Sequence, residues 1–341
     1  MTFFFLIGCS PKAGIDPHLS VEEKIEIKEE FNSFFVGKWN IENNSDNSSK
    51  GIAQCYINSL EFTNEGKYIL KVSDLNDPSK RPRFFNGVYL IIFDESDPTK
   101  IEVDKVFLMQ ENYNEEASLP EIGSVATFDS INISDQGDLS FNVSFGQQTS
   151  EFCNVGQKLS IDARKEEPII SNAPEDSNHF KIQKQWRLIR IDAQSSGNGD
   201  TSVISDPLCK LFEEEWESRC VETPENPTSE GCYPSNTVVI TFTGYGTYLW
   251  TFYDVQGKPV HYEDGRWRWV EKSPQDYSQF EVDFDQSQEY NQTISIVELS
   301  DDNFVVEERQ QETVNGVVFE LIFKYGFQPA SFNFTLSDCS I

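Results

Sequence analysis

The chain of 341 residues carries 27 Lys and Arg against 57 Asp and Glu, which gives a formal net charge of −30. A nucleic-acid binder needs a basic surface to displace counterions, so this charge excludes that class of function. The same charge repels anionic lipid head groups, so any attachment to a membrane must come from inserted hydrocarbon. The length allows two domains, and the prominence of Phe, Tyr, Val and Ile favours strands over long helices.

The first residues, MTFFFLIGCS, form a short apolar run that ends in Leu6-Ile7-Gly8-Cys9. This run resembles the lipobox of bacterial lipoproteins, in which small residues precede a cysteine. The resemblance implies that residues 1–9 are a signal peptide remnant and that Cys9 is lipidated and becomes the mature amino terminus. Each buried methylene of an acyl chain contributes about 0.8 kcal/mol, and two chains anchor stably. The run is too short to span a membrane, which needs about 20 apolar residues. The alternative to a lipidation signal is a short strand.

A polar tether and a short helix are expected over residues 10–30. The segment Ser20-Val21-Glu22-Glu23 has the pattern of a capping box, so the helix should begin there and end near Phe31.

A Pro-rich, acidic stretch at residues 166–178 has the composition of an interdomain linker. It would separate a first domain at residues 31–165 from a second at residues 179–341.

The cysteines divide evenly between these halves once Cys9 is set aside. The disulfide candidates are Cys55 and Cys153 in the first half, and Cys209, Cys220, Cys232 and Cys339 in the second. This partition indicates disulfides within each domain and an oxidising compartment. Cys55–Cys153 is the single pairing available within the first half, whereas the second half leaves several connectivities open. Free buried thiols are an alternative. No C-x-x-C pair occurs and histidines are few, so no metal site is expected.

The two halves repeat each other. Five short matches occur in the same order, and they are Gly37-Lys38-Trp39 with Lys184-Gln185-Trp186, Phe62–Tyr68 with Phe242–Tyr248, Asn86–Tyr89 with Asp264–Trp267, Ile101–Asp104 with Phe280–Asp283, and Ile133–Asp135 with Leu299–Asp301. The second match reads F-T-x-x-G-x-Y in both halves, which is typical of two strands joined by a tight turn. We interpret each half as an all-β domain of about eight short antiparallel strands in an up-and-down meander, closed into a barrel because closure removes exposed edges.

An insertion distinguishes the second half. It separates Trp186 from Phe242 by 55 residues, where only 22 separate Trp39 from Phe62. Within it, Asp206-Pro207 has the pattern of an N-cap followed by proline at the first helical position, which predicts a short helix through Trp216.

Together these features are similar to the lipocalin-like domains of lipoproteins from Bacteroidetes-type bacteria. The matching features are the lipobox, a short helix before a Trp-bearing first strand, the F-T-x-x-G-x-Y hairpin and the Gly-x-Tyr/Trp strand. The resemblance implies two tandem barrels in which Trp39 and Trp186 close one end. It also implies a basic residue packed on that tryptophan, for which Arg164 is the candidate in the first half.

Four aromatic residues of the second half are candidates for a ligand site: Tyr248, Trp250, Trp267 and Trp269. On strands, Tyr248 and Trp250 share a face, as do Trp267 and Trp269. Such pairs can line an apolar or sugar-stacking cavity, although a role in the core is the more common use of aromatic side chains.

Catalytic signatures are absent from the sequence, which has no G-x-S-x-G, H-E-x-x-H or phosphate-binding loop. We therefore expect no enzyme, no cofactor and no metal. The hypothesis is a lipid-anchored binding protein of the outer membrane, periplasmic or at the cell surface, that holds a small apolar or carbohydrate-like ligand. The alternative is a structural or accessory lipoprotein that binds an envelope protein partner through the barrel exteriors.

Overall fold

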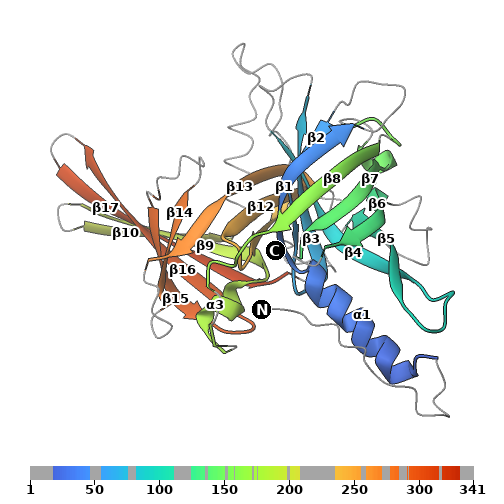
Figure 1. Cartoon of the computed structure of the whole chain (residues 1–341). Coiled ribbons are helices and arrows are strands. Elements are labelled where there is room, and N and C mark those ends of the chain that lie inside the picture. The colour runs from blue at the N-terminus through green and yellow to red at the C-terminus, as the bar shows by residue number, and fades with distance from the viewer. Residues whose placement is uncertain are drawn as a thin grey trace. The chain divides into compact units, whose positions relative to one another are not determined.

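The computed structural model in Figure 1 shows two units built almost entirely of β-strands. It describes residues 18–46, 55–75, 82–110, 124–134, 137–149, 153–156, 158–170, 173–174, 176–197, 200–207, 235–254, 259–270, 277–283, 290, 292–314 and 317–330. The chain divides into its two compact units between Glu167 and Pro168.

The first unit is a closed barrel of eight antiparallel strands in sequence order. The strands are β1 (Gly37–Asp46), β2 (Cys55–Phe62), β3 (Lys67–Asp74), β4 (Arg83–Asp94), β5 (Glu102–Gln110), β6 (Ser124–Ile133), β7 (Leu139–Phe145) and β8 (Lys158–Lys165). Pairing of β1 with β8 closes the barrel. A 3-10 turn, η1 (Gln147–Thr149), follows β7.

The second unit is also a barrel, closed by pairing of β9 with β17. Its strands are β9 (Gln185–Gly197), β11 (Ser235–Phe242), β12 (Thr247–Asp254), β13 (Pro259–Trp269), β14 (Gln279–Asp283), β15 (Gln292–Leu299), β16 (Phe304–Val314) and β17 (Val317–Pro329). Strand β10 (Asp200–Pro207) pairs with the C-terminal part of β9, from Arg190 to Gly197. The expectation of two tandem up-and-down barrels is confirmed.

Helix α1 (Val21–Phe35) begins at the capping box that the sequence predicts. The backbone N–H of Glu23 donates to the Ser20 hydroxyl at 3.1 Å, and the Ser20 N–H donates to the Glu23 carboxylate at 2.8 Å. The helix continues beyond the expected end at Phe31. The added turn carries Phe34 and Phe35, whose rings pack on the barrel's aromatic residues, and this tertiary contact extends the helix.

The F-T-x-x-G-x-Y hairpins are the same structure in both barrels. Gly66 and Gly246 adopt φ angles of 73° and 77°, a region that favours glycine. In the first barrel Tyr68 lies opposite Gly87, and in the second Tyr248 lies opposite Gly265. The N–H of the residue two positions after each of these strand glycines, Tyr89 or Trp267, donates to the carbonyl of the turn glycine. The two hairpins therefore share their hydrogen bonds as well as their sequence motif.

One of the five sequence matches is wrong. Cross-strand pairing places Tyr89 opposite Leu108 and Trp267 opposite Val282, so Val282 corresponds to Leu108. The segment Phe280–Asp283 thus matches residues 106–109 and not Ile101–Asp104. The reason is that β4 and β5 form a longer hairpin in the first barrel, where Phe93 packs against Phe31 of α1.

A helix precedes the first strand in each barrel and ends beside a buried tryptophan. The Trp39 indole Nε1 donates to the Phe35 carbonyl at 3.0 Å. In the second barrel α3 (Asn178–Ile182), which the sequence analysis missed, takes the same place, and the Trp186 Nε1 donates to the Ile182 carbonyl at 3.1 Å. Each tryptophan therefore closes the helix end of its own barrel.

The cation on Trp39 is not Arg164. Arg164 is exposed and pairs with Glu42 and Asp138. Its neighbour Lys165 lies opposite Trp39 in the β1–β8 ladder, so its side chain shares the inner face. The expected residue was off by one position, which reverses the face of a strand.

The expected start of a helix at Asp206-Pro207 is also wrong. Both residues belong to β10, and Pro207, the last residue of that strand, lies opposite Arg190 of β9. Proline is compatible with the end of an edge strand because its missing N–H is not needed there. The rest of the expected helix lies outside the described residues.

In the part of the chain that the structure describes, neither helix is long and apolar enough to cross a membrane.

Candidate functional site

The interior of the first barrel is filled with its own apolar side chains. Trp39, Phe62 and Tyr68 are buried near the helix end, and Ile57, Val72 and others are buried toward the opposite end. We call that opposite end the far end of a barrel. In the first barrel it carries the Cys55–Cys153 disulfide, the pairing that the sequence predicts.

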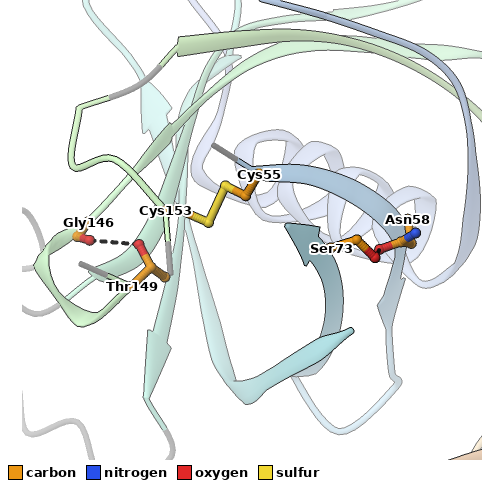
Figure 2. The surroundings of a disulfide bond; sticks show 6 residues. All are labelled: Cys55, Asn58, Ser73, Gly146, Thr149 and Cys153. Atoms are coloured by element: carbon orange, nitrogen blue, oxygen red, sulfur yellow. Dashed lines mark hydrogen bonds between the residues drawn. A yellow bond between two sulfur atoms is a disulfide. The ribbon is translucent and has the colours of Figure 1, made fainter. Parts of the chain in front are cut away.

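Figure 2 shows how this disulfide fastens the segment after β7 to the start of β2. The Thr149 hydroxyl donates to the Gly146 carbonyl at 2.8 Å, and the Cys153 N–H donates to the Thr149 carbonyl at 2.8 Å. Both cysteines are fully buried. The cystine therefore belongs to the apolar core at the far end of the first barrel.

Three of the four predicted aromatic residues pack in the core of the second barrel. Tyr248, Trp267 and Trp269 are buried, with exposed fractions of 1%, 1% and 4%. The Trp267 and Trp269 rings meet edge to face at 5.2 Å, and the Trp267 Nε1 donates to the Thr243 carbonyl at 3.1 Å. These side chains therefore form part of the core of their own barrel.

Helix α3 contributes a buried histidine to this cluster. The Trp269 Nε1 donates to Nδ1 of His179 at 3.1 Å, and the Trp267 and Tyr277 rings flank the imidazole. Burial lowers the pKa of His179 to about 4, so the ring is neutral at pH 7 and can accept this hydrogen bond. The arrangement fixes α3 across the end of the barrel.

Trp250, the fourth predicted residue, lies closer to the far end and is half-buried. It shares the inner face of β12 with Tyr248 and Phe252, since all three pair with inward residues of β11. Its ring reaches Phe327 of β17, with centroids 6.1 Å apart. Phe327 in turn stacks on Phe304 at 5.3 Å. The inward-facing Trp250 ring therefore keeps partial contact with solvent.

The strand pairing shows which residues of the two barrels are equivalent at this level. The equivalent inward pairs, first barrel then second, are Leu70 with Trp250, Val72 with Phe252, Leu159 with Phe323, Ile161 with Tyr325, Val143 with Glu308 and Phe145 with Gln310. Every first-barrel member is at most 2% exposed. We call the six second-barrel members the far-end layer.

The far-end layer combines aromatic rings with polar groups. Trp250, Phe252, Phe323 and Tyr325 are half-buried, whereas the equivalent aliphatic residues are sealed. Glu308 accepts hydrogen bonds from the Gln310 amide and from the Tyr325 hydroxyl, the latter at 3.5 Å. Burial, with the nearby Glu308 carboxylate, raises the pKa of Tyr325, so its hydroxyl keeps its proton. The layer therefore offers flat apolar surfaces beside a fixed carboxylate.

Only Trp250 of this layer was recognised from the sequence. The signal for the others was present in the alternation Phe304, Val306, Glu308, which places a carboxylate on the inner face of β16. It became informative only when pairing aligned Glu308 with Val143 of the first barrel.

The remaining predicted site residues, Cys9, Cys209, Cys220, Cys232 and Cys339, lie outside the described residues. Lipidation of Cys9 and the disulfides of the second half stay predictions. Within the described ranges, His, Cys, Asp and Glu side chains form no group of three that could hold a metal ion.

No protein-family model and no curated protein matches the sequence. Among solved structures, similarity is found to a DUF3598-family protein of unknown function from Nostoc punctiforme, at 10% identity and a TM-score of 0.20, over 88% of this chain and 98% of that one. Transferrin-binding protein B from Haemophilus parasuis is similar at 10% identity and a TM-score of 0.21, over 81% of this chain and 54% of that one. A protein of unknown function from Bacteroides ovatus has 11% identity and a TM-score of 0.21, over 80% and 87%. Similarity of this degree carries no information about function.

Proposed function

We propose that this protein is a binding protein that holds a small ligand against the far-end layer of its second barrel. One observation carries the proposal: at equivalent positions of two duplicated barrels, four sealed aliphatic residues of the first are replaced by half-buried aromatic residues of the second, and the sealed Val143 is replaced by the buried Glu308. The sealed aliphatic residues of the first barrel are sufficient for a barrel to fold, so folding alone does not require the aromatic residues of the second. Aromatic walls with a few placed polar groups are typical of small-molecule sites.

An extracytoplasmic setting is part of this proposal. The Cys55–Cys153 disulfide supports it, because structural disulfides persist chiefly in oxidising compartments. We further propose that lipid on Cys9 ties the protein to the outer membrane, on the periplasmic or the surface side; the lipobox sequence supports this.

The experiment is native mass spectrometry of the full-length protein purified from its own host's membranes. The expected result is a small molecule that leaves when the protein is denatured. A variant carrying Trp250→Leu and Phe252→Val, the residues of the first barrel, should lose that molecule while keeping its fold. The control is Val297→Ala, which changes an exposed side chain of the same barrel.

An unchanged ligand content in the Trp250→Leu and Phe252→Val variant would contradict the placement of the site. A wild-type protein without ligand, and with an envelope protein that cross-links to it, would favour the alternative role of an accessory lipoprotein that binds a protein partner. The mass of the mature amino terminus tests lipidation separately.

A further inference from the structure

We infer that the ligand of the far-end layer is an organic cation, an amine or quaternary ammonium group attached to an apolar body. This inference rests on the proposed function and specifies the chemistry of the same site. It is drawn from the charge, burial and partners of Glu308 and from the rings around it.

Glu308 is a carboxylate with an exposed fraction of 6% on the inner face of the barrel. Its hydrogen-bond donors, Tyr325 and Gln310, are both neutral. Among the described residues no lysine, arginine or histidine forms an ion pair with it. A buried charge without an opposite charge is costly, and a bound cation is the partner that would offset this cost.

The neighbouring residue of the same strand, Glu307, differs from Glu308 because it forms ion pairs with basic side chains. Glu307 points outward and forms ion pairs with Arg309 at 2.7 Å and Lys324 at 3.3 Å. Glu308 is one residue away and points inward, opposite Phe323. The acid that faces the interior is thus the one without a cation in the described part of the chain.

Another charged inward position of this barrel, Glu263, has the same sign of charge as Glu308. Glu263 lies opposite Trp250 in the β12–β13 ladder, so its side chain is on the same face as that ring. It takes the position of Phe85 in the first barrel, which lies opposite Leu70. No inward position of the described strands of this barrel holds lysine or arginine. An anionic ligand would therefore be repelled by the Glu308 carboxylate.

The aromatic members of the layer suit a cation as well as an apolar body. A cation over an indole, phenol or phenyl face is attracted by the ring quadrupole, and the attraction grows when water is excluded. Trp250 and Phe252 lie on β12, while Tyr325 and Phe323 lie on β17, so rings come from separate strands of the barrel wall. A ligand between them can meet several ring faces and the Glu308 carboxylate together.

The test compares three probes that share a ten-carbon chain and differ only in head-group charge: decyltrimethylammonium, decanol and decanoate. Binding to the full-length protein is measured by isothermal titration calorimetry below micelle-forming concentrations. We expect decyltrimethylammonium to bind at least about tenfold more tightly than decanol, and decanoate to bind most weakly.

Glu308→Gln should remove the preference for the cation and leave decanol binding unchanged. Glu307→Gln is the matched control, because it removes the same unit of net charge one residue away on the outer face. It should keep the preference, which separates a local carboxylate from general attraction to a chain of net charge −30.

The outcomes separate the inference from the function on which it rests. Equal or tighter binding of decanol or decanoate by the wild-type protein overturns the cation and leaves a ligand-binding barrel. Preference retained in Glu308→Gln overturns the role of this carboxylate. Absence of binding by all three probes overturns the proposed function together with the inference. Binding of the three probes to the wild-type protein tests the preference for a cation even if the Glu308→Gln variant fails to fold.

Discussion

Lys184 lies over the indole of Trp186, with its Nζ atom 4.8 Å from the ring centroid. In the first barrel the equivalent cation comes from a different strand, since Lys165 reaches 5.5 Å from the Trp39 ring from the position opposite it in β8. The residue opposite Trp186 is Pro329, which carries no charge. The second barrel takes its cation from two residues before the tryptophan instead, and both barrels keep an ammonium over the closing indole.

The two lysines should differ in their contributions to stability. Lys165→Met is expected to lower the free energy of unfolding by about 2 kcal/mol, because it removes the cation over the ring and also the hydrogen bond that Nζ donates to the Phe34 carbonyl at 2.7 Å. Lys184→Met should cost about 1 kcal/mol, because the hydrogen bond that its Nζ atom donates to the Asp301 carbonyl at 2.9 Å is exposed to solvent. Urea unfolding measures both, and equal losses would contradict the larger contribution of the part-buried Lys165 hydrogen bond.

Gly265 should not tolerate alanine. A Cβ at this position would overlap the phenol ring of Tyr248, which lies across the strand. We expect Gly265→Ala to destabilise the second barrel by about 2–3 kcal/mol through overpacking. Gly326→Ala is the control, since its Cβ would meet Arg190 at an ordinary 3.6 Å. Thermal unfolding of both variants is the measurement, and a similar melting temperature for the two would refute the close packing of Tyr248.

Loss of the Cys55–Cys153 disulfide should loosen the first barrel selectively. The bond links residues separated by 98 positions, and constraining an unfolded loop of that size contributes about 4.7 kcal/mol in the chain-entropy model. Hydrogen exchange of the full-length Cys55→Ser, Cys153→Ser protein should show faster exchange in β1–β8 peptides. Peptides from β11–β17 serve as the internal reference, and equal acceleration there would show that the effect is not confined to the first barrel.

His179 should make the second barrel less stable in acid. Its folded pKa is about 4, whereas an unfolded histidine titrates near 6.5. Between these values the unfolded state binds more protons, so stability falls as the pH decreases through this window, by about 3 kcal/mol in total. His179→Asn, whose Oδ1 can replace Nδ1 as acceptor for Trp269, should remove this component. Unfolding is followed by tryptophan fluorescence at pH 7 and pH 5; an unchanged pH dependence in the variant would disprove the assignment.

Much of the fold could be predicted from the sequence because the signals were local. The capping box at Ser20, the F-T-x-x-G-x-Y turns and the alternation of apolar residues each act within a few residues. The pairing of Cys55 with Cys153 followed from counting. The misassigned match at Ile101–Asp104 failed because hairpin length depends on packing against α1, a contact distant in sequence.

The candidate site was harder to predict because exposure inside a barrel depends on all the strands together. Trp250 and Trp267 have the same sequence character, yet one is half-buried toward the far end and the other is sealed beside α3. Glu308 looks like any surface acid until cross-strand pairing places it opposite Phe323. Helix α3 was missed because it is short and its stability comes from Trp186, Trp269 and the barrel end.

The turn glycines, the strand glycines under tyrosine and the indole-closing helix all gather toward one end of each barrel, while the far-end layer lies toward the other. The residues that form the turns and close the barrel are thus different from those of the far-end layer, although both sets lie on the same strands. Substitutions in the far-end layer would leave the turns and the tryptophan at the closed end unchanged, so under the proposed function a duplicated copy is free to acquire a new specificity. In a library of substitutions, tolerance should therefore follow height along the barrel axis more closely than it follows burial.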